Sequence, residues 1–390
     1  MLQSHTTSPN GWVSLQANIC EWSTSRSFFR PQRRFRTLRF AAVFLLMAGG
    51  ATAQSSSSLP SAPSPAPNNS ETVSRPTVLS KSPDLSLAKA ESLMETGQLN
   101  EAEVVVRQDL KRAPDSADAH FLLGHILYRE IQAGAKQTDP NPNAVYAAPP
   151  KSLIELSEKK AKESLTEFTA GAHYHKPSAF DLKIVAMDYV LLGDSIDADK
   201  WLTQSLQWNP NDSDGWYQLG RTKYNENRFT EAIDAFKKCL AIDATNVKAE
   251  ENLGLSYAGL GDDPDAAKAY QTAIDWQTSS VAKDVEAYLA LGTLLLDQNR
   301  PKDAIPVLIE ATQIAPSVSR SHELLGKAYL QIVELVKAQT ELERAVSLSP
   351  DTAHLHYILG QIYRKEGFLT KAKAEFDRCA ALQGGSFSDR

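Results

Sequence analysis

The residues whose chemistry could support catalysis are few, and none belongs to a complete motif. Ser157 and Lys160 have the S-x-x-K spacing of a serine-hydrolase class, but the companion motifs of that class are absent from the sequence. This spacing is expected by chance in a segment rich in Ser and Lys. Phosphate-binding, dinucleotide-binding and zinc-protease motifs are also absent. We therefore predict no catalytic residues and no cofactor.

The eight histidines are the first candidates for a metal site, because the imidazole ring is a common metal ligand. Two H-x-H pairs occur, at His173 and His175 and at His354 and His356. On a helix, residues two apart point about 200° away from each other, so neither pair can hold one ion. We predict no metal site, with an ion shared by His322 and His356 as the alternative.

Composition and charge exclude several classes of protein. The 390 residues are 42% hydrophobic and 23% charged, which is typical of a chain with a sizeable folded core. The net charge is −6, but from Gln54 onward 35 basic and 46 acidic residues give −11. A folded part this acidic is a poor candidate for binding nucleic acid, and we predict none.

The N-terminal segment predicts export. Six arginines lie between Arg26 and Arg39, followed by an apolar run, Phe40 to Ala48, and by Ala51-Thr52-Ala53. A basic segment, a short apolar run and an A-x-A site are typical of a signal peptide over residues 1–53, with cleavage after Ala53. We therefore expect a periplasmic or secreted protein with no membrane span after processing; a retained, tethering signal is the alternative.

Residues 54–83 are predicted to form a disordered linker. Of these 30 residues, 16 are Ser or Pro, so the segment has little apolar surface to bury. It precedes a segment with regular internal similarity, and we expect it to act as a spacer for the folded part.

From residue 84 to 383 the sequence repeats itself. Leu-Gly pairs recur, mostly 34 residues apart, with glycines at Gly124, Gly220, Gly254, Gly292, Gly326 and Gly360. An alanine follows most of them by twelve residues, and a large apolar residue follows that alanine by four, as in Gly220, Ala232 and Phe236. Glycine in a helix costs about 1 kcal/mol relative to alanine, so its recurrence predicts closely packed helices.

This pattern resembles the tetratricopeptide repeat, a 34-residue helix–turn–helix unit. The resemblance implies an all-α, right-handed α-solenoid of stacked units. We count eight units, which begin near Pro83, Ala117, Ala179, Ser213, Val247, Val285, Ser319 and Ala353. Residues 132–152 are predicted to be a loop inserted in the second unit, either disordered or a docking loop anchored by Tyr146. Residues 384–390 form a tail.

The resemblance gives roles to the remaining histidines and to the cysteines. His120, His322 and His356 take the fourth position of their units, where the family often has Trp, so we predict that they pack. Cys239 and Cys379 take small-residue positions four units apart. A disulfide needs Cα atoms about 6 Å apart, so we predict that both are buried free thiols.

The resemblance also implies that positions 2, 5, 9, 12 and 13 of each first helix face a concave groove. The predicted groove residues are Phe121, His125, Tyr128, Arg129, Phe180, Lys183, Met187, Val190, Tyr217, Arg221, Tyr224 and Asn225. Such aromatic and cationic side chains are typical of protein interfaces. A second, basic patch is expected at Lys327, His354, Arg364 and Lys365.

We therefore predict a non-catalytic scaffold that binds an extended peptide or protein segment in this groove. The basic and aromatic groove favours a partner that carries acidic groups. The alternative is a structural protein that self-associates through its last repeat, because no extra closing helix follows that repeat. Weaker alternatives are an enzyme and a saccharide-binding protein.

Overall fold

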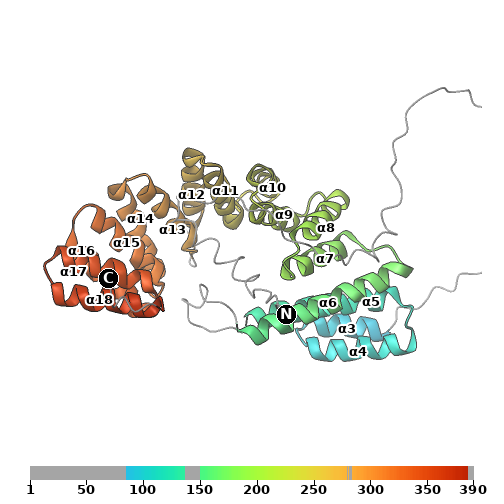
Figure 1. The fold of residues 1–390 in the computed structure, drawn as a ribbon. Coiled ribbons are helices and arrows are strands. Elements are labelled where there is room, and N and C mark those ends of the chain that lie inside the picture. The colour runs from blue at the N-terminus through green and yellow to red at the C-terminus, as the bar shows by residue number, and fades with distance from the viewer. Residues whose placement is uncertain (1–84, 137–149, 279, 281–282, 385–390) are drawn as a thin grey trace, which may run out of the picture.

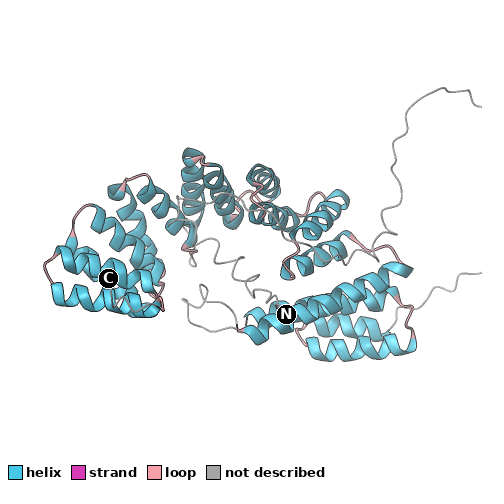
Figure 2. Ribbon diagram, in the orientation of Figure 1, coloured by secondary structure: helices cyan, strands magenta, loops and turns pink. Residues whose placement is uncertain are grey.

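The computed structural model describes residues 85–136, 150–278, 280 and 283–384. All regular elements in these ranges are α-helices (Figure 2). The predicted signal peptide and linker, Tyr146 with most of the predicted loop, and residues 385–390 lie outside the described residues. None of the described helices is both long enough and apolar enough to cross a membrane.

The helices form eight consecutive pairs, which correspond to the eight predicted units. The pairs are α3 (Leu85–Glu95) with α4 (Leu99–Arg112), α5 (Ala117–Lys136) with α6 (Lys151–Tyr174), α7 (Ala179–Leu191) with α8 (Ser195–Trp208), α9 (Ser213–Asn225) with α10 (Phe229–Ile242), α11 (Val247–Leu260) with α12 (Asp263–Gln277), α13 (Glu286–Asp297) with α14 (Pro301–Ile314), α15 (Ser319–Gln331) with α16 (Leu335–Leu348), and α17 (Ala353–Lys365) with α18 (Leu369–Leu382).

Most of the turns within these pairs share one backbone feature. In seven of the eight pairs, a residue one or two positions after the first helix has a positive φ: Gly97, Gly193, Asn227, Gly261, Asn299, Val333 and Gly367. Glycine and asparagine tolerate this left-handed conformation, whereas a β-branched residue is strained in it. Val333, with φ of 64°, is therefore the outlier of the series.

The glycines of the first helices allow the paired helices to pack closely, as predicted. A Cβ added to Gly220 would lie 2.6 Å from the ring of Phe236, which is completely buried. The same contact joins Gly254 to Tyr270, Gly292 to Leu308, Gly326 to Leu342 and Gly360 to Phe376. The large residue sixteen positions after each glycine therefore fills the space that the missing side chain leaves.

The second unit has longer helices than the others. Helix α5 continues to Lys136 and α6 begins at Lys151, so the predicted loop over 132–152 was too wide at its N-terminal end. In α6, Phe168 packs on Gly124 and Ser164 donates a hydrogen bond to the Gly124 carbonyl at 3.2 Å. The repeat contact is kept although the insertion changes its spacing.

The pairs follow a curved path, and the first helices lie on its inner side. Besides its own partner, the first helix of most units contacts the first helix of the next unit: α3 with α5, α5 with α7, α9 with α11, α11 with α13, and α13 with α15. Figure 1 shows this arch, with α7, α9 and α13 inside α8, α10 and α12. Side chains that join successive first helices therefore mark the inner surface.

The last helix has a polar outer face. On α14, a second helix that another unit follows, Ile305 and Ile309 are partly buried. The equivalent residues of α18 are Lys373 and Asp377, which are exposed. At these positions α18 therefore presents charged side chains where α14 has isoleucines.

Candidate functional site

Two side chains predicted to line the groove, His125 and Lys183, are already paired within the protein. The His125 ring nitrogen Nε2 lies 2.6 Å from Asp181 Oδ1, which joins α5 to α7. Lys183 Nζ lies 2.8 Å from Asp212 and 3.1 Å from Asp214, at the start of α9. These contacts place both residues on the inner surface, but they neutralise much of the basic character predicted for it.

Asp181 shows how strongly one of these pairs is held. Its side chain accepts a hydrogen bond from the Ser178 backbone and completes the N-terminal cap of α7. Burial raises the pKa of this carboxyl, but the bonds from His125 and Ser178 outweigh burial and leave the pKa below its usual value. Asp181 is therefore a structural anion that positions His125.

Phe121 was predicted in the groove, and this prediction is wrong. Its side chain is only 8% exposed and its ring lies 6.1 Å from that of Phe168. The cause is the length of α6: Gly171, near its end, lets the Phe121 ring approach the helix backbone closely. Phe121 therefore belongs to the core between α5 and α6.

The tyrosines of the predicted groove are half-buried supports. The Tyr217 ring packs on Phe236, with centroids 6.1 Å apart, and Tyr224 packs on Phe229 at 5.5 Å. Tyr128 is similarly covered, and burial raises its pKa to about 12. Each of these rings keeps part of its surface open to solvent.

Arg221 is the cation of this group that remains available. Its guanidinium lies 5.7 Å from the centroid of the Tyr217 ring, and among the described residues no carboxylate lies within ion-pair distance of it. Asn225, one turn further along α9, is exposed. Arg129, in contrast, donates a hydrogen bond to the Met94 carbonyl at 3.0 Å.

The remaining predicted residues also lie on α7. Phe180 is 54% exposed, and its ring lies 5.2 Å from that of His125 and 5.6 Å from Lys183 Nζ. Met187 and Val190 are half-buried. Phe180 thus provides an exposed ring at the N-terminal end of the inner surface.

Two buried glutamates were not among the predicted residues, although the repeat could have revealed them. Glu251 on α11 and Glu323 on α15 take the fifth position of their units, one of the positions expected to face the groove. Their side chains are 5% and 3% exposed, respectively. Glutamate is almost never buried without a partner, so both require a physical explanation.

Glu323 has its partners within the protein. Its carboxylate pairs with Lys327, with Arg320 at 3.0 Å and with His354 of the next unit at 3.1 Å. Burial raises the pKa of Glu323, but these three side chains outweigh burial and hold it well below its usual value. Two residues of the predicted basic patch, Lys327 and His354, therefore serve this internal cluster.

Glu251 lies in the opposite environment. No hydrogen bond or ion pair reaches it from the described residues, and Asp284 and Glu286 of the next unit add negative charge nearby. Burial, followed by these two carboxylates, raises the pKa of Glu251 to about 8. At neutral pH the side chain is mostly a neutral acid.

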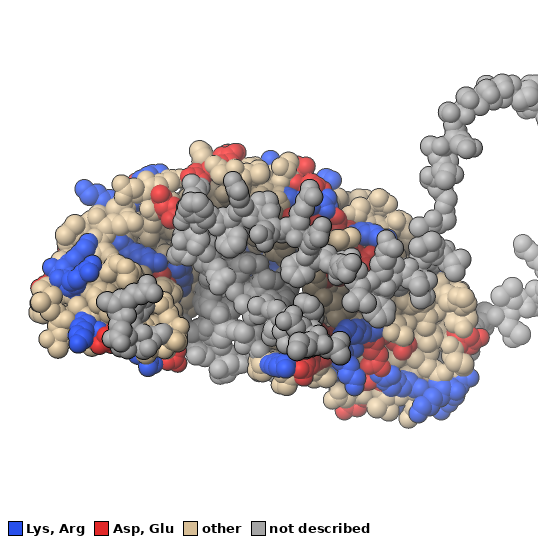
Figure 3. Space-filling view, viewed as in Figure 1, with Lys and Arg blue, Asp and Glu red and all other residues tan. Residues whose placement is uncertain are grey.

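The rest of the basic patch stays exposed. Arg364 lies 5.8 Å from the centroid of the Phe376 ring, and Lys365 is exposed next to it at the end of α17. Figure 3 shows Lys and Arg side chains over the C-terminal units, at the left of the view, with Asp and Glu side chains among them.

The histidines at the fourth position of their units stabilise the fold, as predicted. In His120, His322 and His356, Nε2 lies 2.8–3.1 Å from the carbonyl of the proline six residues earlier, and Nδ1 lies 2.6–2.7 Å from a glutamate of the second helix. Trp216 makes the same bond to the Pro210 carbonyl at 2.8 Å. Each ring thus ties its helix pair to the preceding loop.

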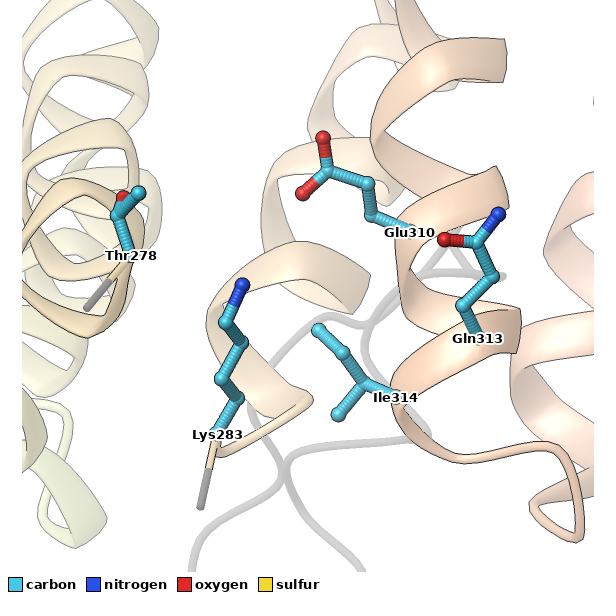
Figure 4. A pocket seen from close by; sticks show the side chains of 5 residues that line it. All are labelled: Thr278, Lys283, Glu310, Gln313 and Ile314. Atoms are coloured by element: carbon cyan, nitrogen blue, oxygen red, sulfur yellow. The ribbon is translucent and has the colours of Figure 1, made fainter. Parts of the chain in front are cut away.

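The described residues contain no group of three metal-binding side chains that could hold an ion. Cys239 and Cys379 are buried free thiols, as predicted, and burial raises the pKa of Cys239 to about 11. A pocket of about 500 Å³ opens where the repeat spacing lengthens between α12 and α13 (Figure 4). Its lining combines polar and apolar side chains: Thr278, Lys283, Glu310, Gln313 and Ile314.

Family models identify the class of protein. Three tetratricopeptide repeat models match the chain, the first at residues 87–131, 251–319 and 289–338, the second at 213–246 and the third at 353–384. These ranges fall on the helix pairs described above. The chain therefore belongs to the tetratricopeptide repeat family and has its α-solenoid fold, which confirms the resemblance found in the sequence.

Curated relatives share parts of this solenoid. The peroxisomal targeting signal receptor of Kluyveromyces lactis is 39% identical over 70 residues, which are 18% of this chain and 12% of the relative. The anaphase-promoting complex subunit cut9 of Schizosaccharomyces pombe is 22% identical over 249 residues, 61% of this chain and 37% of the relative. The chain thus spans only a small part of the relatives' own length.

Solved structures of other proteins are similar to parts of this chain. The peptide-binding repeat protein YrrB covers 47% of this chain and 92% of its own, with 19% identity and a TM-score of 0.40. The Cut9–Hcn1 hetero-tetramer covers 80% of this chain and 55% of its own, with 17% identity and a TM-score of 0.47. PilF of Pseudomonas aeruginosa covers 53% and 93%, with 16% identity and a TM-score of 0.47.

Proposed function

We propose that this protein is a non-catalytic adaptor that binds an extended segment of a partner protein along its inner surface. The observation that carries the proposal is Arg221, a cation on a half-buried aromatic ring with no carboxylate in reach among the described residues. Such a guanidinium can bind a carboxylate with two hydrogen bonds, and the rings beside it provide contact area at low entropic cost.

The partner segment is expected to carry an acidic group opposite Arg221. Lys183 and His125 are paired internally, so neither is available to bind an acidic group of the partner. The predicted preference for acidic groups therefore rests on Arg221 of α9 and on Arg364 and Lys365. Two relatives, a targeting-signal receptor and a subunit of a larger complex, support a protein-binding role.

Charge reversal on the inner surface tests this proposal. Arg221→Glu should weaken capture of the partner from cell extract at least about tenfold, corresponding to 1.4 kcal/mol. Lys302→Glu is a matched control, because Lys302 is an exposed cation on α14, a second helix. Equal capture of the same proteins by both variants and the wild type would contradict the proposal.

We also propose that the adaptor works outside the cytoplasm, in a periplasmic or envelope complex. The support is the arrangement of Arg26–Arg39, the apolar run and Ala51-Thr52-Ala53. N-terminal sequencing of the protein from fractionated cells should find Gln54 as the first residue in the exported fraction. An intact N-terminus in the cytoplasmic fraction would contradict export.

Self-association through the last repeat is a weaker proposal than partner binding. It requires an apolar outer face on α18, and Lys373 and Asp377 occupy the positions at which α14 has isoleucines. A molar mass by light scattering that is independent of concentration is the expected result.

A further inference from the structure

The tetratricopeptide units contain two versions of one buried glutamate site, one complete and one incomplete. Around Glu323, partner side chains come from three places: three residues before it (Arg320), four residues after it (Lys327) and the second position of the next unit (His354). These side chains satisfy a carboxylate that is only 3% exposed. This site shows what a buried glutamate at the fifth position requires.

The same three places around Glu251 do not provide that set. Leu255 takes the place of Lys327, and Glu286 takes the place of His354. Lys248 takes the place of Arg320, but it is exposed and forms no ion pair with Glu251. An acidic side chain, Asp284, adds to the negative charge.

Glu251 also lies where a bound segment would pass. It takes a groove position of α11, the first helix that contacts both α9 before it and α13 after it. The side chain is 95% buried by the protein, with no internal partner among the described residues.

We propose that Glu251, with Asp284 and Glu286, binds a lysine or arginine side chain of the partner segment. This proposal rests on the proposed function and adds a requirement to it: the segment carries a basic residue opposite α11, next to the acidic residue opposite Arg221. The incoming cation takes the place that Lys327 and His354 occupy in the complete site. On binding, the Glu251 carboxyl loses its proton and forms the ion pair.

Peptide selection tests this requirement without a known partner. A random library of displayed 12-residue peptides is selected on the full-length wild-type protein. Selected peptides are then synthesised with each Arg replaced by citrulline, its neutral isostere, or each Lys by norleucine. We expect one replacement to weaken binding to the wild type at least tenfold and to have little effect on binding to Glu251→Gln.

Glu250→Gln is the matched control for this experiment. Glu250 is the neighbouring carboxyl, but it lies near Lys268 of α12 and not on the inner surface. It should retain the wild-type preference for the basic peptide. Calorimetry in buffers of different ionisation enthalpy should also show that binding at pH 7 releases close to one proton from the wild type and none from Glu251→Gln.

The outcomes separate this inference from the proposed function. Peptides that bind the wild type and lose affinity for Arg221→Glu, but contain no required basic residue, would support the groove and overturn the Glu251 site. A basic residue whose replacement weakens binding equally on the wild type and Glu251→Gln would also overturn it. If selection yields no peptide sensitive to either substitution, both proposals fail.

Discussion

Replacing Glu251 by glutamine should stabilise the protein at neutral pH. In the folded chain, burial and then Asp284 and Glu286 raise the pKa of this carboxyl from 4.5 to about 8. The unfolded chain loses the proton near pH 4.5, whereas the folded chain keeps it until about pH 8. Between these values the folded state binds more protons, so its stability falls as the pH rises.

The magnitude follows from the difference in proton binding. Each pH unit between the two pKa values costs 1.36 kcal/mol, so the penalty at pH 7 is about 3 kcal/mol. Glutamine has nearly the same shape and no charge to lose. Glu251→Gln should therefore gain about 3 kcal/mol over the wild type at pH 7 and almost nothing at pH 4.5.

Urea unfolding followed by circular dichroism at pH 4.5, 6 and 7.5 measures this difference. Glu323→Gln is the opposite case at the same repeat position, because it leaves Arg320, Lys327 and His354 without their anion. Since the pKa of Glu323 is lowered on folding, its contribution is present above pH 4.5 and fades as the pH falls below that value. A Glu251→Gln effect that is equal at all three pH values, or destabilising, would refute the reasoning.

Three further substitutions test the packing. Gly220→Ala should destabilise the protein by about 1–3 kcal/mol in urea unfolding, because the new methyl group would meet the Phe236 ring; if helix propensity dominates, stability would rise instead. Val333→Gly should raise stability by about 1 kcal/mol by relieving the strained φ of 64°, and an unchanged or lower melting temperature would show that the turn is not strained. Asp188→Asn should stabilise by about 1–3 kcal/mol at pH 7 and not at pH 4, because burial raises the pKa of this fully buried carboxyl; equal effects at both pH values would argue against a buried acid.

The repeat made much of the fold predictable. Gly220, Ala232 and Phe236 recur with one spacing, and helix geometry alone determines which of them face each other. The packing of His120, His322 and His356 followed from the same logic, because each takes the fourth position of its unit; their bonds to the carbonyl of the proline six residues earlier were not predicted. Such features are local, so a single sequence contains the information that decides them.

In the second unit, the insertion changes the repeat spacing, so contacts could not be predicted from the repeat. Helix α6 has 24 residues and does not keep the spacing of the other units. The repeat therefore did not predict that the Phe121 ring packs against Gly171. The sequence placed Phe121 at a groove position, and the length of the opposing helix decided that it is buried.

The sequence by itself predicted the repeat architecture, and the family matches confirmed it. The sequence also predicted export, which stays a prediction. Only the tertiary structure decided which charges are available. Lys183 is neutralised by Asp212 and Asp214 of the next unit, whereas Arg221 keeps its charge unpaired among the described residues. Glu251 and Glu323 have the same place in the repeat, but their ionisation differs because of the side chains around them: Arg320, Lys327 and, from the next unit, His354 for Glu323, and Asp284 and Glu286 for Glu251. Electrostatic energy depends on these distances and on burial, which repeat position alone does not specify.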